Sequence, residues 1–418
     1  MLRFTDNIIG QMTTACNQRC KYCYEHGPGH STNETMTLES FKEALDTVIY
    51  HRCILGSIDN IVDWHFHGGE VLLLPWSILK QMILYVEERQ KFFPNVTWSM
   101  QSNGTLLTDE VAKFFAIRGK DFGFSWDGFG DNLRMSLKDN EDVINNLVKY
   151  HTKYGLKSSY LLVLSRQNMK TWIDDYLAVK DCIGATQIGI NILCDVKDDL
   201  IPSVDELWTY WAEPVLNSFL TENPIVERDI YTFIQKALTG IVYSIKKKEK
   251  TGCFDRICAH GSNMTTITPS YDMRPCDKYL ECGDFINKRE NWNIKDRDFL
   301  GLQTMNYVYH FYDKLFKEEA KLGCDSCYAN AICQGECQSY NISRYGDIKI
   351  DGSLCSLYRK IYSFIEDNWL TILSNNHIPL VTELENIFGV NSYAHRKAEE
   401  AGKMFVLDKG CIYLKDKE

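Results

Sequence analysis

The chain has 418 residues, a formal net charge of −10 and sixteen cysteines. A nucleic-acid-binding chain would need a basic footprint, whereas the basic run noticed here is the short segment 246–250. No stretch approaches the ~18 consecutive apolar residues of a transmembrane helix, and the N-terminus lacks the layout of a secretory signal peptide. We therefore expect a cytoplasmic protein with no nucleic-acid partner and no membrane partner.

Residues 1–195 alternate between apolar runs rich in β-branched or aromatic residues and segments with helical periodicity. This alternation predicts a parallel sheet with right-handed crossovers, open or partly closed as a barrel. Ligands of such folds gather at the carboxyl ends of the strands. The expected strands are 8–14, 61–67, 96–102, 122–126, 159–164 and 187–193, and the expected helices are 38–51, 75–90, 108–117, 141–154 and 170–182.

The remainder of the chain is organised differently. Residues 204–250 predict two helices with a turn at 222–224, which we interpret as a linker. Residues 253–360 are punctuated by cysteines and turns with little long periodicity, so a small apolar core there would need metal to hold it. A further helix is expected near 393–402. The predicted domains are a β/α domain over 1–200, a helical linker over 201–250, a cysteine-rich domain over 251–370 and a tail over 371–418.

The first cysteine motif directly follows the first expected strand. Cys16, Cys20 and Cys23 have the spacing CxxxCxxC, with Tyr22 before the last cysteine. Three thiolates can bind three irons of a [4Fe–4S] cluster and leave the fourth iron open. A zinc loop is the alternative, although zinc usually takes four ligands. The motif resembles that of the radical S-adenosylmethionine (SAM) superfamily, in which the cluster cleaves SAM to give a 5′-deoxyadenosyl radical and the protein orients this cofactor.

Three later motifs strengthen the resemblance, each after the next expected strand. The segment HGGE at 67–70 is similar to the family's GGE motif, although Val71 stands where many relatives have proline. The segment SNGT at 102–105 is similar to the family's TNG segment, and SWDG at 125–128 occupies the place of ribose contacts. The resemblance implies that SAM is bound by Tyr22, Gly68, Gly69, Glu70, Asn103, Ser125, Asp127 and Arg134.

A second cysteine group reads CxxCx5CxxxC from residue 324 to residue 337. It resembles the SPASM extension of radical SAM peptide and protein maturases. The resemblance implies a partial (β/α)6 TIM-like barrel followed by a small iron–sulfur domain, with three [4Fe–4S] clusters in total. The implied ligands are Cys253, Cys258, Cys276 and Cys337 for auxiliary cluster I and Cys324, Cys327, Cys333 and Cys355 for auxiliary cluster II. The alternative for this region is one or two zinc sites.

Five cysteines lie outside these ligand sets. Cys53 and Cys182 lie at or near the ends of expected helices and are predicted to be small buried apolar residues. Cys194 ends the last expected strand, at the catalytic face. Cys282 is an alternative ligand, a substrate contact or a structural residue, and Cys411 receives no assignment.

The predicted chemistry also needs a base, because a substrate radical must lose an electron and usually a proton. Asp277 follows Cys276, and this pair also occurs in anaerobic sulfatase maturases, so the resemblance implies a catalytic role for Asp277. A turn residue is the alternative. His65 and His67 share one face of their strand, and His67 is the better candidate for the site. A structural histidine is an equal alternative.

Three functions follow from the resemblance. The first is a maturase that forms a thioether or carbon–carbon crosslink in a ribosomally made peptide. The second is an anaerobic sulfatase maturase that oxidises cysteine or serine to formylglycine. The third, an iron–sulfur electron carrier, leaves the SAM motifs unexplained. An enzyme of this class needs a peptide or protein substrate and a reducing partner such as flavodoxin or ferredoxin. Only about fifteen residues precede Cys16, so a leader peptide would need a separate recognition protein or another surface.

Overall fold

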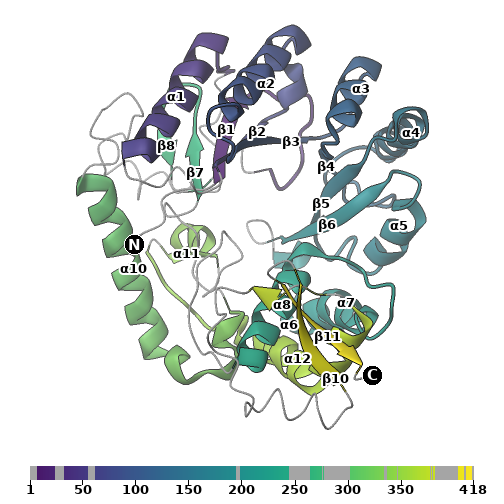
Figure 1. The fold of residues 1–418 in the computed structure, drawn as a ribbon, viewed down its shortest axis with the longest axis vertical. Coiled ribbons are helices and arrows are strands. Elements are labelled where there is room, and N and C mark those ends of the chain that lie inside the picture. The colour runs from purple at the N-terminus through teal and green to yellow at the C-terminus, as the bar shows by residue number, and fades with distance from the viewer. Residues whose placement is uncertain are drawn as a thin grey trace.

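The computed structural model describes residues 7–23, 33–54, 62–193, 198–243, 264–274, 276, 302–333, 337–345, 347–376, 378, 380–381, 403–408 and 411–416. Its largest feature is an eight-stranded sheet with the order β6-β5-β4-β3-β2-β1-β7-β8. The first six strands pair in parallel, and β1 also pairs in parallel with β7. The sheet curves into an open arc with helices α1 to α5 along its outer side (Figure 1). The predicted partial barrel is therefore confirmed.

Strands and helices alternate along this part of the chain as expected, and the strand limits agree within two residues. The strands are β1 (Asn7–Thr13), β2 (Val62–Gly68), β3 (Val96–Ser102), β4 (Phe122–Ser125), β5 (Ser158–Leu164) and β6 (Ala185–Ile192). The helices are α1 (Leu38–Ile54), α2 (Trp76–Gln90), α3 (Asp109–Arg118), α4 (Leu137–Tyr154) and α5 (Trp172–Val179), with a 3-10 turn η2 (Val71–Leu73) after β2. Capping residues fix the helix starts: the Thr108 hydroxyl accepts from Val111 N and the Ser136 hydroxyl accepts from Asp139 N.

The two faces of the arc differ in polarity. On β2, Trp64 and Phe66 are fully buried against Phe41 of α1, with ring centroids 5.1 and 5.6 Å apart. The alternate residues of β2 point to the inner face, because successive strand side chains point to opposite sides. A cavity of about 530 Å³ lies on that inner face, lined by polar residues that include Asp63 and His65. The core thus lies between sheet and helices, and the concave side stays open to polar ligands.

Residues beyond β6 supply both more sheet and a helical layer. Helix α6 (Val204–Leu207), the π-helical turn η4 (Trp208–Ala212) and α7 (Glu213–Ser218) run without a break, and α8 (Arg228–Tyr243) follows, which confirms two helices here. Strands β7 (Met264–Ile267) and β8 (Met273–Arg274) then extend the sheet beside β1. The predicted domain limits at 200, 250 and 370 stay predictions. None of the helices in the described ranges is long and apolar enough to cross a membrane.

The cysteine-rich region is more helical than its sequence suggested. Helices α10 (Leu302–Lys321), α11 (Gln338–Tyr345) and α12 (Cys355–Asn375) are joined by the 3-10 turns η6 (Cys324–Ser326) and η7 (Tyr328–Ala331). The prediction of little periodicity is therefore wrong for α10 and α12. The buried face of α12 packs on α8, where the rings of Tyr358 and Phe233 lie 5.6 Å apart.

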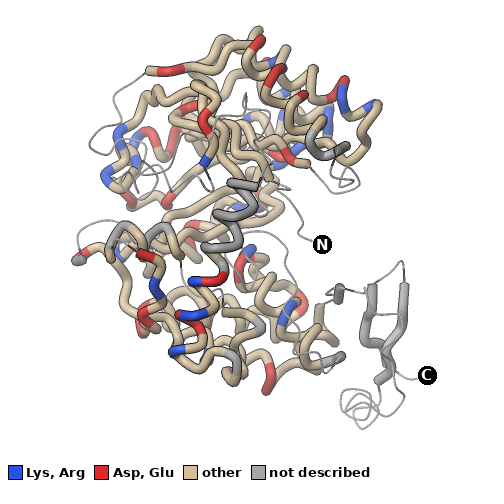
Figure 2. The backbone as a smooth tube through the Cα atoms, turned by 90° about the vertical axis from the view of Figure 1, so that its left-hand side faces the viewer, with Lys and Arg blue, Asp and Glu red and all other residues tan. Residues whose placement is uncertain are grey.

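The C-terminal tail contains strands rather than only the expected helix. Strands β9 (Leu380–Val381), β10 (Lys403–Asp408) and β11 (Cys411–Asp416) form an antiparallel sheet with the order β10-β11-β9. The expected helix at 393–402 lies outside the described residues. Acidic and basic residues are interspersed along the described backbone (Figure 2).

Candidate active site

The loop after β1 carries the first three cysteines to the carboxyl end of the sheet. Cys16, Cys20 and Cys23 are half-buried, and none forms a disulfide. The Gln18 N–H donates to Cys16 Sγ at 3.4 Å, and the Cys23 N–H donates to the Cys20 carbonyl at 3.1 Å. Burial raises the pKa of the Cys16 and Cys20 thiols. Binding of a cation would favour the thiolate form of these cysteines.

The two glycines of the HGGE segment serve the packing of this loop. Gly68 has φ +128°, and a Cβ there would collide with the Thr13 carbonyl. A Cβ on Gly69 would collide with the Ala15 carbonyl. Both close contacts are hydrogen-bonded, since Gly69 N donates to Thr13 O at 2.7 Å and Glu70 N donates to Ala15 O at 2.8 Å. The glycines thus let the end of β2 hold the beginning of the cysteine loop.

Glu70 connects the ends of β2 and β3. Its side chain is 1 % exposed. One carboxylate oxygen accepts from Leu72 N at 2.9 Å and from Ser102 Oγ at 2.8 Å, and the other accepts from Asn103 N at 2.7 Å. Burial raises the pKa of Glu70, and the charge of Glu70 in turn contributes to raising that of Cys16. The predicted SAM ligand is thus a buried, hydrogen-bonded carboxyl group beside the first cysteine.

Asn103 links the cysteine loop to the end of β3 through hydrogen bonds. They involve Asn17, a residue that the sequence motifs did not indicate. Asn103 Nδ2 donates to Asn17 Oδ1 at 2.8 Å, while Asn103 Oδ1 accepts from Thr105 Oγ1 at 2.7 Å. Asn17 Nδ2 also donates to Thr105 Oγ1 at 2.9 Å. Asn17 lies inside the cysteine motif, so this network fastens the loop to the end of β3. The sequence did contain a signal for this role, because Asn17 has an amide side chain and directly follows the predicted ligand Cys16.

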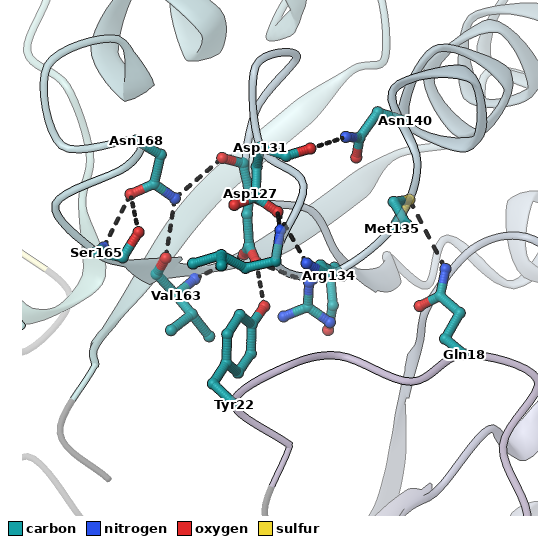
Figure 3. A network of polar contacts seen from close by, with 12 residues as sticks. Gln18, Tyr22, Asp127, Asp131, Arg134, Met135, Asn140, Val163, Ser165 and Asn168 are labelled. Carbon is teal, nitrogen blue, oxygen red and sulfur yellow. Dashed lines mark hydrogen bonds and ion pairs between the residues drawn. The ribbon is translucent and has the colours of Figure 1, made fainter. Parts of the chain in front are cut away.

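Asp127 is the centre of a second network, drawn in Figure 3. One carboxylate oxygen accepts from the Tyr22 hydroxyl and from Arg134 Nε at 3.1 Å, and the other accepts from Val163 N at 2.9 Å. The Asp127 and Arg134 side chains are 1 % and 10 % exposed. The Arg134 guanidinium carbon lies 5.5 Å from the centre of the Tyr22 ring. These contacts bring three predicted SAM-binding residues together; on the neighbouring strands, Ser125 Oγ accepts from Gln101 Nε2 at 2.9 Å.

Asp131 shapes the segment between Asp127 and Arg134 and was not singled out from the sequence. Its carboxylate accepts from Leu133 N at 3.1 Å and from Arg134 N at 3.0 Å (Figure 3). Burial, followed by the nearby charge of Asp127, raises the pKa of Asp131 to about 6. The network therefore contains one carboxylate paired with arginine and one that titrates near neutral pH.

The histidine pair of β2 lies on the inner face of the arc. His65 Nδ1 and Ser99 Oγ are 2.8 Å apart, and the Ser99 hydroxyl also donates to Asp63. The rings of His65 and His67 lie 5.4 Å apart. Burial raises the pKa of Asp63. His65 is therefore held by neighbouring polar side chains, as in a structural histidine, while His67 lies next to Gly68 at the candidate site.

The structure gathers one predicted auxiliary ligand set. Cys324, Cys327, Cys333 and Cys355 line a single pocket, together with Asn330, Arg359 and the buried Glu319. Asn330 Nδ2 donates to the Cys324 carbonyl at 2.6 Å. Thiolates are the ligands that iron–sulfur clusters require, so the donor set at this pocket fits such a cluster. Across the described ranges, however, no group of three or more His, Cys, Asp or Glu side chains is arranged to hold a metal ion.

The other predicted ligands are less completely described. Cys276 is half-buried and Cys337 is exposed. Cys53 and Cys182 are both exposed, so the prediction that they are buried is wrong: Cys53 lies near the C-terminal end of α1, and Cys182 lies beyond the end of α5. Four cysteines and the proposed base lie outside the described residues, namely Cys194, Cys253, Cys258, Cys282 and Asp277.

Comparison with known proteins supplies relatives for this architecture. Residues 11–178 match the model of the Radical SAM superfamily. A cysteine-type anaerobic sulfatase-maturating enzyme of Clostridium perfringens is 21 % identical over 390 residues, which cover 88 % of this chain and 98 % of that protein. A serine-type anaerobic sulfatase-maturating enzyme of Bacteroides thetaiotaomicron is 28 % identical over 366 residues, which cover 81 % of this chain and 84 % of that protein.

Solved structures agree at the level of fold. Native anSMEcpe with bound AdoMet superposes with a TM-score of 0.66 and 18 % identity, over 89 % of this chain and 99 % of that one. SuiB of Streptococcus suis bound to S-adenosylmethionine gives a TM-score of 0.58 and 14 % identity, over 84 % and 77 % of the two chains. Residues 11–178 thus form a radical SAM domain, and the chain is homologous over most of its length to the anaerobic sulfatase-maturating enzymes.

Proposed function

We propose that this chain is a radical SAM enzyme that modifies a residue within a peptide or protein. The observation that carries the proposal is the convergence of the cysteine loop, Glu70 and the Asp127–Arg134 pair at one end of the sheet. Two related structures support a peptide substrate, because anSMEcpe has been solved with a Cp18Cys peptide and SuiB with the precursor peptide SuiA.

In this proposal Cys16, Cys20 and Cys23 would hold a [4Fe–4S] cluster, and Glu70, Asn103, Ser125 and the network of Asp127 would bind SAM. When bound, the cluster and SAM supply the radical that abstracts hydrogen from substrate. The protein supplies orientation: the buried carboxylates of Glu70 and Asp127 offer negative charge, and Arg134 offers a buried cation. Hydrogen bonds within the chain orient these groups, and such preorganised groups need little rearrangement to stabilise charge.

The cysteine-rich region has a separate role in the proposal. Cys324, Cys327, Cys333 and Cys355 hold one auxiliary cluster, and Cys253, Cys258, Cys276 and Cys337 hold the other. A cluster bound there would supply an acceptor for the electron that the substrate radical must lose, and Asp277 or another base would accept the proton. A flavodoxin-type or ferredoxin-type reductant and, for a leader peptide, a separate recognition protein complete the scheme.

Two reactions remain in competition within this class. Crosslinking of a ribosomally made peptide is the first candidate, and SuiB, with its precursor peptide, is a structural relative. Formylglycine formation is the second, and the length of the alignments with both cysteine-type and serine-type sulfatase-maturating enzymes favours it. A crosslink removes hydrogen and keeps every sulfur, whereas formylglycine formation from cysteine removes the sulfur.

The test is anaerobic incubation of reconstituted protein with SAM, a reductant and two synthetic peptides, followed by mass spectrometry. One peptide is a short Cys-rich peptide, and the other carries a sulfatase modification segment with cysteine. Formation of 5′-deoxyadenosine together with a modified peptide is the expected result. Failure to form 5′-deoxyadenosine with any reductant would contradict the proposal, and the product mass would separate the two reactions.

A further inference from the structure

Helix α12 brings a cation to the pocket of the four cysteines. The helix begins at Cys355, and Arg359 lies one turn later on the same face, because helical residues four apart are neighbours. Both residues line the pocket with Cys324, Cys327 and Cys333. Arg359 is the basic residue among the described residues that line this pocket, and Glu319, which is 3 % exposed, is the acidic one.

Arg359 lies beside the predicted ligands. It lines the same pocket as Cys327 and Cys355. A guanidinium stays charged in proteins, so Arg359 brings a fixed positive charge to this pocket. Since Arg359 is exposed, removing it leaves no buried charge behind and no cavity in the core.

We propose that Arg359 is a positioning residue that raises the reduction potential of the auxiliary cluster held by Cys324, Cys327, Cys333 and Cys355. This inference rests on the cofactor assignment of the proposed function. The potential of an iron–sulfur cluster depends on its net charge, its exposure and hydrogen bonds to its sulfurs. A guanidinium that lines the pocket would stabilise the more negative, reduced form of a bound cluster, so the cluster would accept one electron more readily.

The neighbouring residue on α12 supplies a matched control. Lys360 carries the same charge, but its Nζ pairs with Asp205 at 3.2 Å and lies 5.7 Å from the ring centre of Trp208. It does not line the cysteine pocket. Loss of charge at Lys360 therefore reports the effect of a distant surface cation, which solvent and salt screen.

The experiment is a redox titration of the anaerobically reconstituted full-length protein, followed by electron paramagnetic resonance. Dithionite donates one electron to each cluster, and no bond forms or breaks. The signal that Cys355→Ala removes is assigned to this cluster. In Arg359→Gln we expect its ratio of reduced to oxidised form at a fixed potential to fall at least about tenfold, which is about 59 mV for one electron. We expect a smaller fall in Arg359→Lys, none in Lys360→Gln, and unchanged signals from the other clusters.

An unchanged potential in Arg359→Gln, with wild-type iron content, would overturn the inference. Loss of about four irons from both Arg359 variants would also overturn it, because the residue would then retain the cluster rather than tune it. If Cys355→Ala keeps the wild-type iron content, the cofactor assignment itself fails and the inference falls with it. SAM cleavage measured on the same samples separates that failure from a failure of the radical SAM site.

Discussion

The two cysteine sites of this chain are built in different ways. The loop of Cys16, Cys20 and Cys23 is held by residues distant in sequence, since Tyr22 contacts Asp127 across 105 positions and Asn17 contacts Thr105 across 88. The pocket of Cys324 is held locally, since Asn330 reaches the Cys324 carbonyl across only six positions. The first site therefore requires the whole parallel sheet, whereas the second depends on two short turns and the start of one helix.

The largest effect should come from removing a ligand at either site, because the sites belong to separate parts of the chain. Cys16→Ala, Cys20→Ala or Cys23→Ala should remove about four irons and abolish SAM cleavage. Cys355→Ala should also remove about four irons but leave SAM cleavage in place. Anaerobic iron analysis and a 5′-deoxyadenosine assay measure both. Loss of all iron from a single variant would contradict the independence of the two sites.

Asp127→Ala should test how strongly the first site depends on the fold. This change leaves Arg134 buried without its carboxylate partner, and loss of one partner of a buried pair costs about 3–5 kcal/mol. Denaturant unfolding of the variant should reveal that loss, with weakened binding of SAM. As a control, Lys153→Ala breaks the exposed pair with Asp109 and should leave stability unchanged. Equal stability of Asp127→Ala and wild type would argue against a network that holds the loop.

The pH dependence of the same network follows from Asp131. Its pKa in the folded chain is about 6, above the ~3.9 of an exposed aspartate, so the folded state binds the proton more tightly. The resulting stabilisation is complete below about pH 4 and is lost as the pH rises through about 6, by up to ~3 kcal/mol. Between pH 5 and 7 the wild type should lose stability relative to Asp131→Asn. If the stability of the two proteins changed with pH in the same way, the pKa of Asp131 would not be raised in the folded chain.

The smallest effect is expected at the pocket of Cys324, Cys327, Cys333 and Cys355. Asn330→Ala removes the hydrogen bond to the Cys324 carbonyl, and the loss of one such bond costs about 1 kcal/mol. We expect a modest loss of stability, faster release of the auxiliary iron to a chelator and unchanged SAM cleavage. A chelation time course compares the variant with wild type. Reduced SAM cleavage in Asn330→Ala would mean that the two sites are coupled.

The sequence predicted the radical SAM half of this molecule well, because that half repeats one unit. Alternation of buried and inward residues along strands such as β2 and β3 is a local signal, so the strands and their parallel order followed from the pattern. The cysteine loop and the motifs after β2, β3 and β4 then fell at the same edge of the sheet, since parallel strands all end there.

Other features of the fold and of the site could not be predicted from the sequence, and the physical reason differs from one residue to the next. The roles of Asn17 and Asp131 arise from hydrogen bonds that exist only in the folded chain. Helix α12 buries apolar residues at helical spacing, namely Leu357, Ile361 and Ile365. The cysteines around them led to the prediction of turns instead of a helix. The exposure of Cys53 and Cys182 depends on which residues pack around them in the folded chain, and their position in the sequence does not determine that packing.

The central claim is that Cys16, Cys20 and Cys23 hold a cluster that cleaves SAM. The most direct measurement is reductant-dependent formation of 5′-deoxyadenosine by the anaerobically reconstituted protein, with iron and sulfide determined on the same sample. We expect cleavage by the wild type, none by Cys20→Ala, and about twelve irons per chain when all three clusters are present. Zinc in place of iron, or no cleavage under any reductant, would contradict it.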